Sequence, residues 1–331
     1  TKIFNKKIST FSIIDSDSRY NEQKEIKKIC KDLNCENQTF EISKKNFIKN
    51  LTNMIDYHDS PVWTLSHYLH NLLMRSISAT NTKVVFSGIG GDEMFGGYYD
   101  HYLLHLHSIK NEKNFKENKF FWEKNIRSFI RNKNFLNHDL FSSKKIDGRY
   151  IFDGYDEISV YLNKPEKNIF KENTFSNNKF SNRRINEIFY ETLPVMLNNE
   201  DLNSMNYSIE NRSPFLSKDV FTQCFSSPQE YLIRNGYSKY VLRESLSGIL
   251  IDDIRLKRQK KGFNCSIHSL IDTSSKKNLD FLLNKKSPIF EFVNRNKIEE
   301  LLKKKKKDNH LSKFLFNFIS TKIFLDKNFK S

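Results

Sequence analysis

Strand-like and helix-like segments alternate along the first hundred residues, and this alternation limits the folds open to the chain. Residues 8–15, ISTFSIID, form the apolar, β-branched run of a buried strand, and residues 21–34 follow with apolar side chains at helical spacing. The same criteria predict a strand, two helices and a third strand at residues 38–43, 44–58, 67–77 and 83–87. Strands joined through helices form parallel sheets, so residues 1–105 are predicted to be an α/β layer with a doubly wound parallel sheet.

The strand pattern fades after residue 105. Residues 110–180 are rich in Asn, Lys and Phe, with only weak periodicity and no functional signal. Helical spacing returns in INEIFYETLPVML (185–197) and in the final KFLFNFISTKIFL (313–325). Residues 106–331 are therefore predicted to be mainly helical and packed on the sheet.

Composition favours a folded intracellular protein. The 331 residues are 37% hydrophobic, which is enough for a sizeable core. Four scattered cysteines, Cys30, Cys35, Cys224 and Cys265, lack the spacing of a zinc site and fit a reducing compartment. Because the sequence contains neither a long apolar run nor a signal-peptide pattern, we expect a cytoplasmic protein without a membrane partner.

The formal net charge of +16 raises the possibility of a nucleic-acid partner. The lysines are spread over the whole chain, however, and acids are interleaved with them. The densest run, 303–307, follows two leucines and is expected to be the solvated end of a helix. No nucleic-acid partner is predicted.

Half of the ten glycines fall within SGIGGDEMFGGYY (87–99), directly after the strand predicted at 83–87. Glycines let backbone amides approach a nucleotide closely, and Asp92 and Glu93 offer carboxylates to a cation. A tight turn followed by acids that stabilise a helix start explains the pattern equally well. The loop has neither the GxxxxGK[ST] nor the GxGxxG spacing.

Three blocks carry a specific resemblance. These are KVVFSGIGGDEMFGGYYDHY, LPVMLNNEDLNSMNYSIENRSPFLSKDV and YLIRNGYSKYVLRESLSGILIDDIRLKRQKKGF, preceded by TFSI near the start. In this order they resemble the synthetase domain of the glutamine-hydrolysing asparagine synthetase family. The resemblance implies an adenine nucleotide alpha hydrolase-like fold of the PP-loop ATPase type. It also implies a ligase that adenylates a carboxylate and converts it to an amide.

The resemblance implies ATP and Mg²⁺ as cofactors and aspartate as acceptor, with ammonia delivered from glutamine by a separate glutaminase domain; a homodimer is compatible with it. Ser87 and Gly88 would contact the nucleotide, and Ile13 would lie on the adenine, although a core position explains Ile13 as well. Asp92 would bind Mg²⁺, with Glu93 as a supporting acid. Lys239 would stabilise the α-phosphate.

Two arginines have structural alternatives. Arg243, in the same block as Lys239, would reach a phosphate or serve an ion pair. Arg212 would contact an anion or form a buried ion pair with Glu210 or Asp201, and the structural role is favoured for both acids.

The sequence departs from the family pattern in two places. No glycine precedes Gly88, so the first strand and its Ser-Gly-Gly-x-Asp-Ser loop are missing, as is the glutaminase domain. Residues 1–331 are therefore expected to be an incomplete synthetase domain, inactive in isolation. Ile89 stands where these enzymes usually have a glutamate, and isoleucine cannot move a proton or pair with an ammonium. Asparagine synthesis remains the first prediction, with amidation of another carboxylate, such as a sugar uronate or a peptide, or an inactive scaffold as alternatives.

Overall fold

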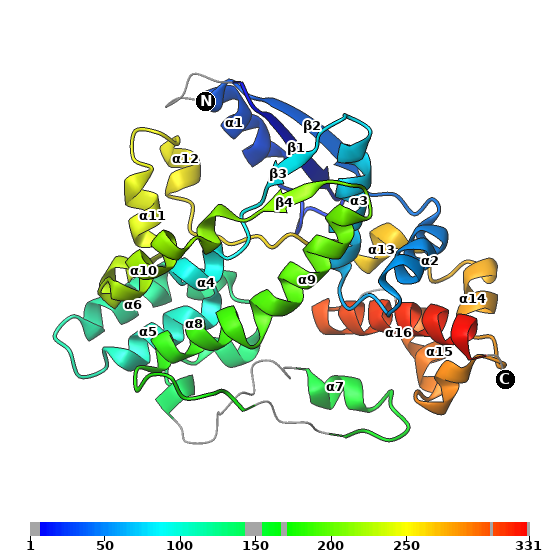
Figure 1. Ribbon diagram of the computed structural model, residues 1–331. Coiled ribbons are helices and arrows are strands. Elements are labelled where there is room, and N and C mark those ends of the chain that lie inside the picture. The colour runs from blue at the N-terminus through cyan, green and yellow to red at the C-terminus, as the bar shows by residue number, and fades with distance from the viewer. Residues whose placement is uncertain (1–6, 143–153, 167–170, 305–306, 330–331) are drawn as a thin grey trace.

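Short strands and many helices alternate in the computed structural model, which describes residues 7–142, 154–166, 171–304 and 307–329 (Figure 1). The strands are β1 (Ser9–Ile14), β2 (Glu36–Glu41), β3 (Val84–Phe86), β4 (Glu210–Arg212), β5 (Ile233–Arg234) and β6 (Tyr237–Ser238). The helices of the first half are α1 (Gln23–Leu33), α2 (Phe47–His58), α3 (Leu65–Ser78), α4 (Gly91–Phe95), α5 (Tyr99–Ser108), α6 (Phe115–Asn125) and α7 (Tyr155–Ser159). Those of the second half are α8 (Lys179–Phe189), α9 (Thr192–Met205), α10 (Lys218–Ser226), α11 (Tyr240–Ser245), α12 (Asp252–Arg255), α13 (Ile267–Leu270), α14 (Lys276–Leu282), α15 (Arg295–Lys303) and α16 (Asn309–Asn328).

Two parallel strand pairs carry the α/β part of the fold. β1 pairs with β2 with Ser9 opposite Glu36, and α1 forms the crossover between them. β3 pairs with β4 with Val84 opposite Glu210. Parallel pairing agrees with the prediction, but in the described residues the pairs are separate two-stranded sheets. One doubly wound sheet is therefore not confirmed.

The β3–β4 pair is covered on one face only. Val85 packs with Met74 and Ile77 of α3, whereas Val84 and Phe86, which point the other way, are 39% and 69% exposed. In a doubly wound sheet, helices cover both faces. In the part of the chain that the structure describes, the β3–β4 pair has such a cover on one face and therefore forms only part of this arrangement.

Periodicity predicts most elements of the first hundred residues. β1, α1, α2, α3 and β3 lie within or close to the expected segments, and β2 begins two residues early. The segment 185–197 is broken into α8 and α9 at Tyr190 and Glu191. β4 was not predicted, because its three residues, ENR, have no apolar pattern.

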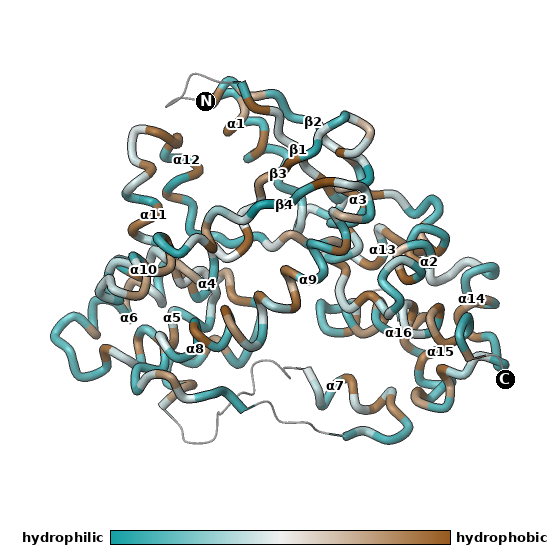
Figure 2. The backbone as a smooth tube through the Cα atoms, viewed as in Figure 1, coloured by the Kyte–Doolittle hydropathy of each residue, from teal (hydrophilic) through white to brown (hydrophobic). Residues whose placement is uncertain are grey.

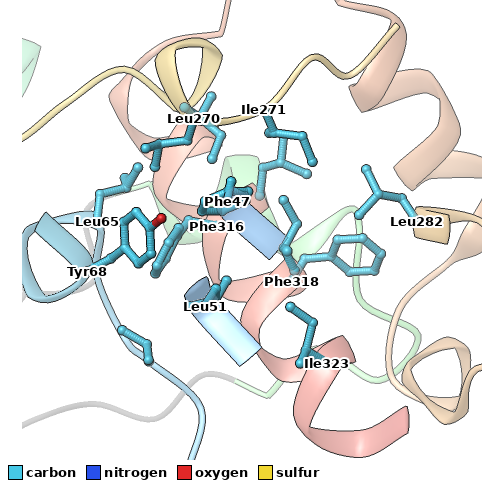
Figure 3. Packing of buried hydrophobic residues seen from close by; sticks show 14 of the residues in the cluster. Phe47, Leu51, Leu65, Tyr68, Leu270, Ile271, Leu282, Phe316, Phe318 and Ile323 are labelled. Carbon is cyan, nitrogen blue, oxygen red and sulfur yellow. The ribbon is translucent and has the colours of Figure 1, made fainter. Parts of the chain in front are cut away.

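Two apolar cores stabilise separate groups of helices. The first core joins α2 and α3 to α13–α16, and Figure 3 shows Phe47, Tyr68 and Phe316 packed together within it. Phe47 meets Tyr68 edge to face with ring centroids 5.2 Å apart. The second core joins α4, α5, α6, α8 and α10.

The segment of residues 256–266, here the connecting segment, crosses from α12 to α13 and so links the two groups of helices (Figure 1). The backbone N–H of Ser266 donates to Asp15 at the end of β1 (2.8 Å). Lys261 donates to the carbonyl of Asn21 (2.7 Å), and Ser66 of α3 donates to the carbonyl of Phe263 (2.7 Å). These bonds hold the connecting segment against the strand ends.

Within the described residues, no helix combines the length and apolar character needed to cross a membrane. Figure 2 shows hydrophilic and hydrophobic residues mixed along the helices, including α16, the longest of them.

Candidate functional site

The segment 87–97, here the glycine loop, follows β3 and contains the short helix α4. Gly90 and Gly96 bound that helix with φ of +84° and +70°, a region that favours glycine. A Cβ at Gly90 would also lie 2.2 Å from Cδ2 of Leu216. Glycine is thus required at Gly90 by both conformation and packing, and the loop places Asp92 in the first turn of α4.

Asp92 lies between two lysines. Its Oδ1 is 2.9 Å from Nζ of Lys239, and its Oδ2 is 2.9 Å from Nζ of Lys260. Burial would raise the pKa of this carboxyl, but the charges of Lys260 and Lys239 and their hydrogen bonds outweigh it and lower the pKa to about 2. Asp92 is therefore ionised at neutral pH, while about a quarter of its side chain remains exposed.

The two lysines come from different parts of the fold. Lys239 precedes α11 in a left-handed conformation (φ 55°), and its N–H donates to the carbonyl of Phe95 in α4. Such a conformation is strained for a lysine and persists where the surrounding structure imposes it. Lys260 lies on the connecting segment, with Nζ 3.8 Å from the centroid of the Tyr98 ring. Lys260 is not among the predicted site residues, although RQKKGF stands in the third matching block.

The side chain of Glu93 is buried in the interior and contacts Tyr98, not the site around Asp92. Only 1% of it is exposed, and it accepts a hydrogen bond from the Tyr98 hydroxyl (2.5 Å). Burial raises the pKa of Glu93. We infer that the buried hydrogen bond between Glu93 and Tyr98 stabilises the conformation of the glycine loop.

Arg184 of α8 holds the end of α4. Its buried guanidinium donates to the carbonyls of Glu93 (2.9 Å) and Met94, and it lies over the ring of Phe225 (4.2 Å to the centroid). Carbonyls near a helix end lack intrahelical partners, so a buried cation is favourable there. This residue was not predicted, since helical spacing alone marks it as one of many surface arginines.

A polar cluster lies at the carboxyl ends of β3 and β4. The Ser87 hydroxyl is 3.3 Å from that of Ser213. Glu200 of α9 accepts a hydrogen bond from the Asn211 amide (2.7 Å), and the nearby Ser87 hydroxyl favours its ionised form. Ligands of parallel α/β sheets bind at this end of the strands.

The contacts described for the remaining predicted site residues do not involve Asp92. Gly88 has open space where a Cβ would be, with no protein atom of the described residues within 4 Å. Ile13 lies on β1 opposite Phe40 and packs against the first core. Arg243 donates to the carbonyls of Ser238 (2.8 Å) and Arg255. Contacts with a nucleotide remain predictions for Ile13, Ser87, Gly88 and Arg243.

Arg212 pairs with Glu210 on the surface. Its Nε lies 2.7 Å from the Glu210 carboxylate, and both side chains are more than half exposed. The ion pair with Glu210 is one of the roles expected for Arg212, but it lies on the surface and is not buried as expected.

A second titratable cluster, Asp100, His101 and Glu187, lies buried with its ligand atoms within 4.8 Å of one another. His101 Nε2 is 2.9 Å from Glu187, but Arg183 also lies 3.0 Å from Glu187 and 3.0 Å from Glu172. A guanidinium at this distance repels a metal ion, so the cluster is better explained as a buried charge network.

Parallel strand pairs joined through helices define an α/β protein, and on the short helix that follows β3 one ionised carboxylate is shared by two lysines. Residues 1–325 match the family described as asparagine synthase. The chain belongs to the asparagine synthetase family and represents its synthetase domain, whose fold is the α/β fold of the PP-loop ATPase type.

A curated relative supports this assignment. The chain is 23% identical over 280 residues to asparagine synthetase (glutamine-hydrolysing) 1 of Bacillus subtilis strain 168. The match covers 79% of this chain and 43% of that protein, so the chain spans less than half the length of this relative.

Proposed function

We propose that this chain is the synthetase part of a ligase that adenylates a carboxylate with ATP and then converts it to an amide. The observation that carries the proposal is the Asp92 carboxylate held between Lys239 and Lys260 at the start of α4. Adenylation brings two anions together and sends pyrophosphate away, so prepositioned cations stabilise the charge that develops. Family membership supports the same reaction class.

The residues present fit a Mg²⁺ ion bound with ATP. Asp92 offers an ionised oxygen ligand of the kind that magnesium takes. Lys239 and Lys260 would then bind the phosphates in place of Asp92. Glu93 is engaged by Tyr98 and is not available as a ligand. The ion would neutralise phosphate charge.

Aspartate is the acceptor that we propose first, because the curated relative is an asparagine synthetase. The position of Ile89 favours a second candidate. Ile89 is 7% exposed and belongs to the second apolar core. Ile89 therefore provides no carboxylate that could pair with the ammonium group of an acceptor. An isoleucine at this position favours an acceptor such as a sugar uronate or a peptide carboxylate.

We further propose that the site is completed by protein outside residues 1–331. The separate β1–β2 and β3–β4 pairs and the bare face of Phe86 support an additional strand and phosphate-binding loop. A glutaminase domain would supply ammonia. On this proposal the isolated chain is inactive.

Pyrophosphate release from the full-length protein tests the proposal, with aspartate compared against a panel of carboxylates and with ammonia or glutamine supplied. Release and amide formation with aspartate would establish asparagine synthesis. Release only with another carboxylate would establish the second candidate. No release with any carboxylate would refute the ligase and favour a scaffold with the same fold.

A further inference from the structure

The amide-forming half of the proposed reaction needs a base, and the glycine loop does not provide one. When nitrogen attacks an acyl-adenylate, it must lose a proton. Ile89 has no titratable group. Asp92 is held by two lysines with a pKa of about 2, which makes it a weak base. Glu93 is buried and bonded to Tyr98.

Glu200 is the remaining carboxylate at the carboxyl ends of β3 and β4. It accepts a hydrogen bond from Asn211 of β4 and lies near Ser87, the first residue of the glycine loop. Its side chain is 18% exposed, so a small ligand can reach it. In the described residues its only ion-pair partner is His70 of α3, with Nε2 at 4.0 Å.

His70 does not neutralise Glu200. Burial lowers the pKa of His70 to about 4, so the ring is neutral near pH 7, and no hydrogen bond to its Nδ1 occurs in the described part of the chain. The charged residues of β4, Glu210 and Arg212, pair with each other instead. Glu200 is thus a half-buried carboxylate without a cation, and burial raises its pKa.

We propose that Glu200 accepts the proton from the nitrogen nucleophile; this rests on the proposed ligase function. The nitrogen lone pair forms the C–N bond, the C–O bond to AMP breaks, and AMP leaves with that electron pair. The proton released from nitrogen passes to the Glu200 carboxylate. Asn211 orients the carboxylate through the hydrogen bond described above.

The test separates the two half-reactions in the full-length protein. ATP–pyrophosphate exchange reports adenylation, and amide formation from ammonium reports the second step. Glu200→Gln should leave exchange within a few-fold of wild type and lower amide formation by about 100-fold or more. Formate should partly restore amide formation in Glu200→Ala. Glu123→Gln removes the same charge from an exposed position on α6 and is the matched control.

Amide formation near the wild-type rate in Glu200→Gln would overturn the proposal. So would an equal loss of exchange and amide formation with an unchanged circular dichroism spectrum, since that result marks a positioning residue. If Glu200→Gln does not fold, Glu200→Asp and the formate rescue decide by the same comparison. Absence of exchange in wild type with every carboxylate would instead refute the ligase function itself.

Discussion

At the scale of single residues, the site depends on how closely side chains pack around Asp92. A Cβ at Gly97 would lie 1.9 Å from Oδ1 of Asp92 and 2.5 Å from Cε of Lys239. No side chain fits there, so the glycine keeps the carboxylate and the lysine in contact. Lys260 completes the arrangement from the connecting segment.

Gly97→Ala should therefore weaken binding of a non-cleavable ATP analogue. The added methyl group must displace Asp92 or Lys239, and we expect a loss of affinity of about tenfold or more, roughly 1.4 kcal/mol. Calorimetric titration of the full-length protein measures it. Gly262→Ala is the control, since among the described residues nothing beyond Gly262 and its two chain neighbours lies within 4 Å of its Cβ position. Equal affinities in both variants would contradict the packing argument.

Lys260→Met should weaken the same analogue by a similar factor. The substitution removes the largest contribution that lowers the pKa of Asp92, so this pKa should rise, and it also removes one cation from the site. Lys28→Met removes an exposed lysine paired with Asp253 at 2.7 Å and serves as the comparison. Calorimetric titration of both variants with the ATP analogue at pH 7 measures the effect. If Lys260→Met binds the analogue as tightly as wild type, Lys260 does not contact the ligand.

Sequence reasoning reached some of these residues and not others. The family resemblance of the matching blocks led to Asp92 and Lys239, and the structure brings both together. Lys260 stood in a quoted block but looked like one lysine among several. Glu200 stands in the second matching block, but nothing in the sequence distinguishes it from its neighbours, because Asn211 and Ser87 meet it only through the folding of the chain.

At the scale of elements, periodicity predicts those whose own residues alternate in polarity. α1, α2 and α3 have one apolar face each and lie close to the segments expected. β4 is specified by its pairing with β3 rather than by its own side chains, so no local pattern predicts it. The length of β3 and the exposure of Phe86 likewise depend on which segments pack beside them, and their own side chains do not predict either.

α3 should make folding stability sensitive to mild acid. Burial lowers the pKa of His67 and His70 from 6.5 to about 4. The unfolded chain binds these protons first, so the stabilisation is complete above pH 6.5 and is lost as pH falls toward 4. Each ring should contribute on the order of 3 kcal/mol.

Urea unfolding at intervals between pH 7.5 and pH 4.5 measures this dependence. His67→Gln should reduce the fall in the free energy of unfolding, whereas His138→Gln, at a more accessible position, should leave it unchanged. A His67→Gln protein that loses as much stability as wild type over this range would contradict the assignment.

At the scale of the whole molecule, the site lies between two groups of helices with separate cores. The first core holds α13–α16, and the second holds the glycine loop through Ile89, Met94 and Phe95. The connecting segment runs between them and carries Lys260 (Figure 1). A ligand bound to both lysines would therefore restrain the connecting segment.

Trypsin should cleave the connecting segment of the full-length protein more slowly when a non-cleavable ATP analogue and Mg²⁺ are present. Lys257, Lys260 and Lys261 lie there, and each is partly exposed. Cleavage after Lys297 and Lys303 of α15, whose side chains are 49% and 69% exposed, provides the internal reference. Mass spectrometry of the fragments gives both rates, and a constant ratio would show that the nucleotide does not contact the segment.

On the proposed function, the pairing of one carboxylate with two lysines makes ligand binding an exchange of partners. In the free protein Asp92 occupies both ammonium groups. Phosphates that take over the lysines release the carboxylate, and only then is it free for a cation. Nucleotide and cation would thus strengthen each other's binding by the same factor, as thermodynamic reciprocity requires. Neither would be held well alone.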